Sequence, residues 1–116
     1  MYKEGENNSV LIEYLGDHPI IRVIDFLIEN RLFDYSKKQI AENAGIGKVT
    51  LFKYWERLEE IGIVKVTRKF GKTKLYKLNE GNEVVKRLIE LELALADMIS
   101  EIIAKEEKTK VEKEDS

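Results

Sequence analysis

Three glycines in the middle of the chain mark changes in the spacing of its apolar residues, and they restrict the fold more than any other feature. Before Gly45 and before Gly62 the apolar residues recur at helical spacing, which predicts a short helix over 37–43 and a longer one over 48–61. Around Gly71 they alternate instead, as in strands. Because glycine adopts the left-handed backbone that ends helices and closes turns, each position predicts a sharp change in chain direction.

The elements predicted on either side complete a mainly helical domain. Asp17 can cap a helix over 19–31, where apolar residues again recur at helical spacing. Beyond the two central helices, 63–69 and 73–78 alternate β-branched or aromatic residues with polar ones, which is typical of a hairpin. From 81 to 104 the spacing is helical once more. Charged residues interrupt this last run, so it is not expected to span a membrane.

The two ends of the chain are polar. The start, 1–9, has no apolar run and predicts no secretory signal, and the short apolar stretch 10–15 is expected to be an extended segment packed on the core. The end, 105–116, has a single apolar residue in twelve, which predicts a frayed or disordered tail. An acidic interaction tail is the alternative. Residues 1–104 are therefore expected to form one domain, with about 80–104 as its last helix.

The composition excludes several classes of function. The 116 residues include no cysteine and one histidine, His18, so disulfides, zinc clusters and thiol catalysis are excluded, and no metal or cofactor is expected. His18 has no triad partner in view and is interpreted as a surface residue of a capping turn, not a catalyst. The chain is therefore not expected to be an enzyme. The high lysine and glutamate content without cysteine favours a thermophile and a reducing, cytoplasmic location.

Charge is unevenly distributed along the chain. Taken as a total, the net charge of −2 argues against nucleic acid as a partner. However, residues 1–34 carry −4 and residues 79–116 carry −5, whereas residues 35–78 contain eleven Lys or Arg and four Asp or Glu, a net +7. The basic block coincides with the two central helices and the hairpin. A surface that binds the phosphates of DNA is therefore expected there.

Two short helices joined by a glycine-containing turn are typical of a helix-turn-helix, which offers its second helix to the major groove. The segment Ser36–Leu78 resembles the winged helix-turn-helix regulators of the MarR and ArsR type, which are abundant in archaea. The resemblance implies a DNA-binding fold with a hairpin wing and a long last helix. Metal sensing is not implied, because the Cys and His ligands of ArsR sensors are missing. The matching residues are Ala41, Gly45, Ile46, Leu58, Gly62, Ile63, Val64, Gly71, Tyr76 and Leu78.

The candidate DNA contacts lie on the outer side of the recognition helix, in the helix before it and in the wing. An exposed Phe52 suits a thymine methyl or a sugar, although it could instead turn back onto the core or a partner subunit. Lysines in a hairpin could likewise only protect an edge strand from aggregation. The predicted DNA-binding residues are Lys37, Lys38, Lys48, Val49, Thr50, Phe52, Lys53, Arg57, Arg68, Lys69, Lys72 and Lys74.

The last helix carries an apolar seam at alternating spacings of four and three, which is typical of a coiled coil. Further apolar residues beside it make the face wider than one partner helix needs. One stripe is expected to pack on the chain's own first helix and the other on a second subunit. The alternative is a last helix that packs only against its own chain. The predicted dimerisation residues are Val84, Leu88, Leu91, Leu95, Met98 and Ile102.

These patterns together predict a homodimeric, sequence-specific transcriptional regulator. Its partners are double-stranded DNA and a second copy of itself. A dimer would present two recognition helices about one DNA turn apart, ~34 Å, and so read an inverted repeat. The alternative is a winged-helix module for protein interaction within transcription or replication machinery, whose basic face would meet an acidic protein.

Overall fold

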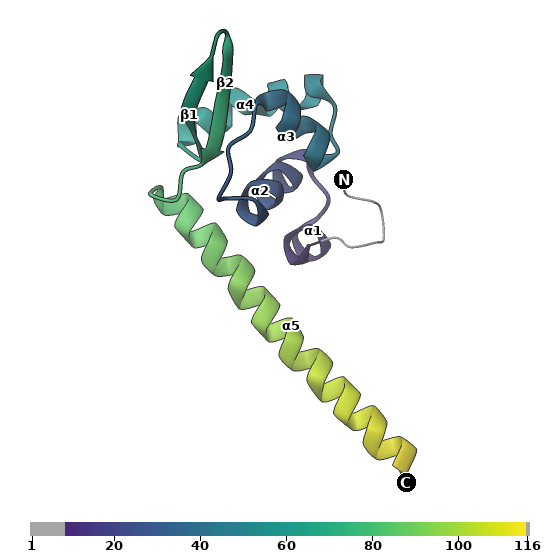
Figure 1. Ribbon diagram of the computed structural model, residues 1–116. Coiled ribbons are helices and arrows are strands. Elements are labelled where there is room, and N and C mark those ends of the chain that lie inside the picture. Colours follow the sequence, from purple (N-terminus) through teal and green to yellow (C-terminus); the bar gives the residue numbers. More distant parts are fainter. Residues whose placement is uncertain (1–8, 116) are drawn as a thin grey trace.

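The computed structural model describes residues 9–115, so the polar start at 1–8 and Ser116 lie outside the described residues. The described chain forms a small helical body with a hairpin rising from it, and a long helix that leaves the body (Figure 1). This confirms the predicted fold class. In chain order the elements are α1 (Val10–Leu15), α2 (Pro19–Glu29), α3 (Lys37–Ala44), α4 (Lys48–Ile61), β1 (Val64–Phe70), β2 (Thr73–Leu78) and α5 (Glu83–Asp115).

A single apolar core lies where the elements of the body meet. Each element contributes at least one buried residue, and the large apolar residues that are buried most completely are aliphatic. Burial of these side chains is the main contribution to the stability of the body. The large apolar residues with 1% exposure or less are Leu11, Leu27, Ile40, Leu51, Leu78 and Val85.

The changes in chain direction predicted at the three glycines are confirmed. Gly45, Gly62 and Gly71 all have positive φ, at 72°, 85° and 57°. At the other end of α3, the Ser36 hydroxyl accepts a hydrogen bond from the Gln39 backbone, and the Gln39 side chain accepts one from the Ser36 backbone. These local signals set where α3 and α4 begin and end.

The two strands pair antiparallel, and a bulge lies between Val66 and Arg68. At the base of the hairpin, Tyr35 from the loop before α3 forms an isolated antiparallel bridge with Tyr76 of β2. Tyr35 and Tyr76 exchange two backbone hydrogen bonds, of 2.9 and 2.7 Å. Since Tyr76 belongs to β2, these bonds attach the wing to the start of α3 and limit its swing relative to the body.

The start of the chain differs from the prediction. Residues 10–15 form the helix α1 and not an extended segment: the Ser9 hydroxyl accepts a hydrogen bond from the backbone N–H of Ile12, and Leu11 and Ile12 are buried. Two adjacent buried residues beside three exposed ones fit a single helical turn. Six residues are too few for apolar spacing to distinguish a helix from a strand.

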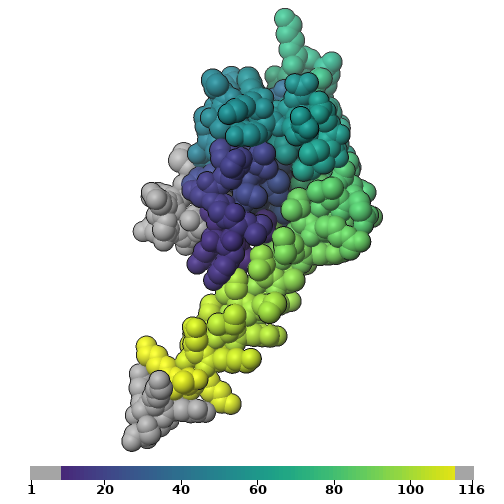
Figure 2. All heavy atoms as spheres, turned by 180° about the vertical axis from the view of Figure 1, so that it is seen from behind, coloured from purple at the N-terminus to yellow at the C-terminus, as the bar shows by residue number. Residues whose placement is uncertain are grey.

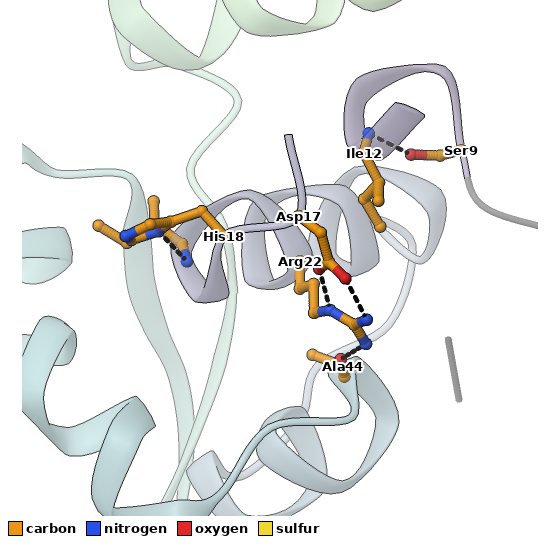
Figure 3. Close-up of polar contacts among 7 residues, drawn as sticks. Ser9, Ile12, Asp17, His18, Arg22 and Ala44 are labelled. Carbon is orange, nitrogen blue, oxygen red and sulfur yellow. Dashed lines mark hydrogen bonds and ion pairs between the residues drawn. The ribbon is translucent and has the colours of Figure 1, made fainter. Parts of the chain in front are cut away.

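The cap of α2 also differs, as Figure 3 shows. His18, not Asp17, is the N-cap residue, and its Nδ1 accepts a hydrogen bond from the backbone N–H of Ile20 at 3.1 Å. Asp17 instead binds the guanidinium of Arg22, which also donates to the carbonyl of Ala44 at 3.4 Å. Arg22 thus connects α2 to the end of α3, and His18 has the capping role expected of it.

The helix α5 is longer than predicted. It continues to Asp115, so residues 105–115 are helical and not frayed. Lysine and glutamate are good helix formers, and pairs of opposite charge four residues apart, such as Glu101 with Lys105 and Glu106 with Lys110, favour the helix. In the view from behind, this helix projects far beyond the body (Figure 2). Within residues 9–115, no helix combines the length and apolar composition needed to cross a membrane.

Candidate nucleic-acid interface

A basic cleft lies between the start of α3, the first half of α4 and the wing. Its volume is about 570 Å³, and five of the nine residues that line it are lysines. Two lysines come from the first turn of α3, one from the first residue of α4 and two from the tip of the wing. The lining residues are Ser36, Lys37, Lys38, Lys48, Phe52, Lys72, Thr73, Lys74 and Tyr76.

The lysines at the starts of α3 and α4 are unfavourably placed with respect to the helix dipoles. Lys37 and Lys38 occupy the first turn of α3, and Lys48 begins α4. Positive charge at a helix N-terminus costs a few tenths of a kcal/mol, because the backbone there is itself partly positive. Gly47, the N-cap residue of α4, has no side chain to cap the helix, so the first N–H groups of α4 receive no side-chain hydrogen bond. Backbone and lysines together make this a site for an anion.

Lys37 is held by three aromatic rings. Its Nζ lies 5.4 Å from the ring centre of Phe52, 5.7 Å from that of Trp55 and 5.8 Å from that of Tyr76. These rings come from α4 and β2, and Trp55 and Tyr76 pack edge to face with a centroid separation of 4.8 Å. A cation so close to ring faces is attracted by their negative quadrupoles. The ammonium of Lys37 is therefore fixed at one wall of the cleft.

The outer face of α4 carries the uncharged candidates. Val49 is 85% exposed and Phe52 is 49% exposed. Thr50 is half-buried. Phe52 has two environments: Nζ of Lys37 and Nζ of Lys48 lie 5.4 and 6.0 Å from its ring centre, and about half of the side chain faces solvent. It therefore joins the cleft to the outer face and does not turn fully into the core.

Arg68 in the wing is not a free cation. Its Nε and Nη2 each donate a hydrogen bond of 2.9 Å to the carboxylate of Asp34, and the hydroxyl of Thr67 donates a third, of 2.6 Å. These bonds and the charge of Arg68 lower the pKa of Asp34 to about 2. Arg68 thus fastens β1 to the loop before α3, in addition to any contact it makes outside the chain.

The remaining basic candidates flank the cleft. Lys53 lies over the ring of Tyr54, with 5.5 Å from Nζ to the centroid, and Arg57 forms an ion pair with Glu60 at 3.5 Å. Lys69 is an exposed residue of β1. The structure therefore brings together six of the twelve predicted DNA-binding residues in the cleft and leaves six around it: Val49, Thr50, Lys53, Arg57, Arg68 and Lys69.

The second half of α4 is acidic. Glu56, Glu59 and Glu60 line a smaller hollow of about 300 Å³ on the other side of Lys37 and Phe52. The boundary between the lysine-rich and glutamate-rich surfaces therefore crosses α4 near its middle. An anionic ligand is attracted to the first half of α4 and repelled by the second.

The predicted dimerisation residues fall into two groups. Leu88 and Leu95 are partly buried against the body. Val84, Leu91, Met98 and Ile102 are 46%, 41%, 63% and 52% exposed. The seam thus lies at the border between the face of α5 that packs on the body and a face that is open in one copy of the chain.

Two polar residues that were not among the predicted site residues organise the site. Asp34 orients the wing, and Asn82 joins α4 to α5. The side chain of Asn82 donates to the carbonyl of Ile61 at 2.9 Å and accepts from the N–H groups of Val84 and Val85 at 2.8 and 3.2 Å. An asparagine before an acidic first turn is an N-cap signal that could have located Asn82.

A cluster of three acidic residues joins α2 to α5. The ligand atoms of Asp25, Glu29 and Glu92 lie within 4.8 Å of one another, a spacing that a metal ion could bridge. Asp25 is fully buried, and burial together with the charges of Glu29 and Glu92 raises its pKa to about 7. Burial and a hydrogen bond to Glu29 also raise the pKa of Glu92. The carboxyl of Asp25 can therefore keep its proton up to near neutral pH.

Comparison with protein-family models finds no match, and comparison with curated proteins finds none either. The structure is similar to solved structures of low sequence identity. One is the homodimeric winged helix-turn-helix DNA-binding domain of a possible ArsR-family transcriptional regulator from Mycobacterium bovis, with 23% identity, a TM-score of 0.53, and coverage of 79% of this chain and 80% of that one.

Two further solved structures are similar to this chain over most of its length. A mutant of Lactococcus lactis ZitR in its apo form has 19% identity and a TM-score of 0.60, over 88% of this chain and 82% of that one. A MarR family regulator from Neisseria meningitidis has 16% identity and a TM-score of 0.56, over 81% and 67%. Together with the helix order and the hairpin, these likenesses show that the chain adopts the winged helix-turn-helix fold.

Proposed function

We propose that this protein is a DNA-binding transcriptional regulator that acts as a homodimer and has no enzymatic activity. The observation that carries the proposal is the basic cleft, where five lysines from three elements converge on one surface. In this proposal α4 enters the major groove, the wing contacts the backbone or the minor groove, and the phosphates between them meet the cleft. No cofactor is required, and the protein acts in the cytoplasm.

The similar structures support this proposal. Those from Mycobacterium bovis and Neisseria meningitidis are described as a DNA-binding domain of a possible ArsR-family regulator and as a MarR family regulator. The charge distribution adds independent support, because none of the nine residues that line the cleft is acidic. Acidic flanks keep non-specific affinity for DNA low and orient the basic face.

The shape of the chain supports the homodimer. Its radius of gyration is 17.4 Å, with extents of 67 × 28 × 21 Å. A compact domain of this length would have a radius of about 13 Å. The difference comes from α5, which exposes Met98 and Ile102 beyond the body. Exposed apolar residues in a regular stripe are typical of an interface.

Binding to random-sequence duplex DNA, followed at several salt concentrations, tests the proposal. We expect the logarithm of the affinity to fall linearly with that of the salt concentration. Lys48→Ala and Lys74→Ala should each weaken binding roughly three- to ten-fold and reduce the slope by up to about one. Lys108→Ala, on the distal part of α5, is the matched control and should change neither. No duplex binding at low salt, with binding to an acidic protein instead, would favour the interaction-module alternative.

The mass of the free protein in solution tests the homodimer. Met98→Glu places a charge on the open stripe and should give a monomer. Leu93→Glu places the same charge on another face of α5, where Leu93 is 60% exposed, and should leave the dimer intact. A wild-type monomer, or equal effects of the two variants, would contradict this part of the proposal.

A further inference from the structure

We propose that Val49, near the start of α4, contacts the C5-methyl group of thymine in the major groove and so selects T·A base pairs in the bound DNA. This inference rests on the DNA-binding function proposed above and names the feature of DNA that α4 reads. It concerns the base edges, whereas the lysines of the cleft concern the phosphates, which are the same in every sequence. The two proposals can therefore fail separately.

Among the side chains that the structure describes, Val49 is the most exposed large apolar one, at 85%. Successive residues of an α-helix are about 100° apart around its axis, so Val49 points away from Leu51 and Trp55, which are buried. Valine is also one of the weaker helix formers. The side chain of Val49 therefore contributes little to the fold, and its methyl groups are available for a contact outside the chain.

The charges of α4 favour an approach of DNA to its first half. Lys48, which precedes Val49, lines the basic cleft, whereas Glu56, Glu59 and Glu60 line the acidic hollow along the second half. A duplex is attracted to the first half and repelled by the second, so α4 would enter the groove by its N-terminal end. Val49, the second residue of α4, would then meet the base edges.

The composition of α4 leaves few other ways to recognise an A·T pair. Asn and Gln pair with adenine through two hydrogen bonds, and α4 contains neither. The arginine fork suits guanine, and the one arginine of α4, Arg57, lies in the second half and pairs with Glu60 at 3.5 Å. Thymine presents a methyl group in the major groove, which apolar side chains contact. Val49 offers such a side chain.

The two neighbours of Val49 on the helix surface are drawn to its flanks. Residues three and four positions apart are neighbours on a helix, so Phe52 and Lys53 border Val49. The ring of Phe52 lies at the cleft, 5.4 Å from Nζ of Lys37. Nζ of Lys53 lies 5.5 Å from the ring centre of Tyr54. The isopropyl group of Val49 is therefore left open between them to a base edge.

Selection of bound sequences from random duplexes, followed by replacement of thymine, tests the inference. In the selected duplex each thymine is replaced in turn by deoxyuridine, which lacks only the C5-methyl group. We expect at least one replacement to weaken binding about four-fold, the effect of burying one methyl group. A C·G pair at that position should weaken binding further. The same pair with 5-methylcytosine should recover about four-fold relative to cytosine.

Variants of Val49 test whether this side chain makes the contact. Val49→Ala shortens an exposed side chain and introduces a better helix former, so the variant should fold. It should bind the thymine and deoxyuridine duplexes equally well. Val49→Thr keeps the branched shape but replaces one methyl group by a hydroxyl, and should show a reduced preference for thymine. Val111→Ala, at a valine of α5 that is 54% exposed, is the matched control and should keep the full four-fold preference.

Three results would overturn the inference and leave DNA binding intact. One is salt-dependent binding that selects no sequence or that no deoxyuridine replacement weakens. Another is a four-fold loss with deoxyuridine that Val49→Ala leaves unchanged, since another side chain or the shape of the DNA would then read the thymine. The third is 5-methylcytosine that binds no better than cytosine. By contrast, no duplex binding at low salt would overturn both this inference and the proposed function.

Discussion

Asp34 and Arg68 form a two-point ion pair in which both carboxylate oxygens accept a hydrogen bond of 2.9 Å from the guanidinium. The pair joins two segments that are 34 residues apart, the loop before α3 and strand β1. Arg68 lies beside the bulge of β1, where the ladder is irregular. Together with the bonds between Tyr35 and Tyr76, it fixes the angle at which the wing stands over α4.

Removing Arg68 should change the titration of Asp34. In the wild-type protein the carboxyl of Asp34 should titrate near pH 2, because Arg68 and Thr67 stabilise its charged form. In Arg68→Ala its pKa should return towards 3.8, the ordinary value. The charged pair stabilises the fold above that value, and this contribution is lost as the pH falls from about 4 towards 2. Carbon-13 NMR of the carboxyl groups measures both titrations, and identical curves would contradict the role given to Arg68.

Replacing Lys37 should disturb the rings around it. Lys37→Met keeps the apolar stem but removes the charge that lies near Phe52, Trp55 and Tyr76. We expect a loss of about 1 kcal/mol in the free energy of unfolding and a shift in the fluorescence of Trp55. Lys38→Met, at the exposed neighbour, is the control and should change neither. A fluorescence spectrum that Lys37→Met leaves unchanged would show that the ammonium does not lie among the rings in solution.

Asp25 should make the protein less stable as the pH rises. Its carboxyl keeps its proton up to about pH 7 in the folded chain but loses it near its ordinary pKa of 3.8 in the unfolded chain. The free energy of unfolding should therefore fall between about pH 4 and 7, by up to about 1.4 kcal/mol per pH unit from this group.

Asp25→Asn should remove the fall in the free energy of unfolding that Asp25 causes between about pH 4 and 7, and the variant should be more stable than the wild type at pH 8. Urea unfolding at several pH values measures this free energy. Parallel stability curves for the two proteins would rule out the burial of a protonated Asp25. Glu92, whose pKa is also raised, remains in the variant, so a smaller pH dependence should persist.

Gly62 should tolerate a side chain poorly. Its φ of +85° is unfavourable for other residues, and an added Cβ would lie 2.9 Å from Nδ2 of Asn82, which holds the end of α4 to the start of α5. Gly62→Ala should lower the free energy of unfolding by about 1–3 kcal/mol. Gly81→Ala is the control, since the nearest atom there is 3.6 Å away and the backbone is not in the left-handed region. Urea unfolding measures both variants. Equal losses in the free energy of unfolding for Gly62→Ala and Gly81→Ala would show that the contact between Gly62 and Asn82 does not contribute to stability.

Much of the fold could be predicted because its signals are local. The bounds of α4 agree with the prediction at both ends, and the hairpin agrees to within one residue, since glycine and the apolar period act over a few neighbouring residues. Ile61, the last residue of α4, is 45% exposed because the helix ends there. The prediction was wrong for α1, whose six residues are too few to show a period.

The candidate site was predicted in its composition but not in its arrangement. The eleven basic residues of 35–78 are visible in the sequence, and five of them line the cleft. Nothing in the sequence distinguishes Lys37, which three rings surround, from Lys38, which is exposed. The rings come from positions 15 to 39 residues away, and only the packing of α3, α4 and β2 brings them together.

The sequence by itself determined the order of helices and strands from α2 onward, the turns between them and the location of the basic segment. These depend on backbone conformation and on the solvation of nearby side chains, which neighbouring residues decide. The tertiary structure alone decided which charges are paired and which are free to meet a ligand. Asp34 neutralises Arg68, whereas Lys48, Lys72 and Lys74 converge on an open cleft. An electrostatic partner is set by distance in space, and residues far apart in the chain become neighbours only when the core forms.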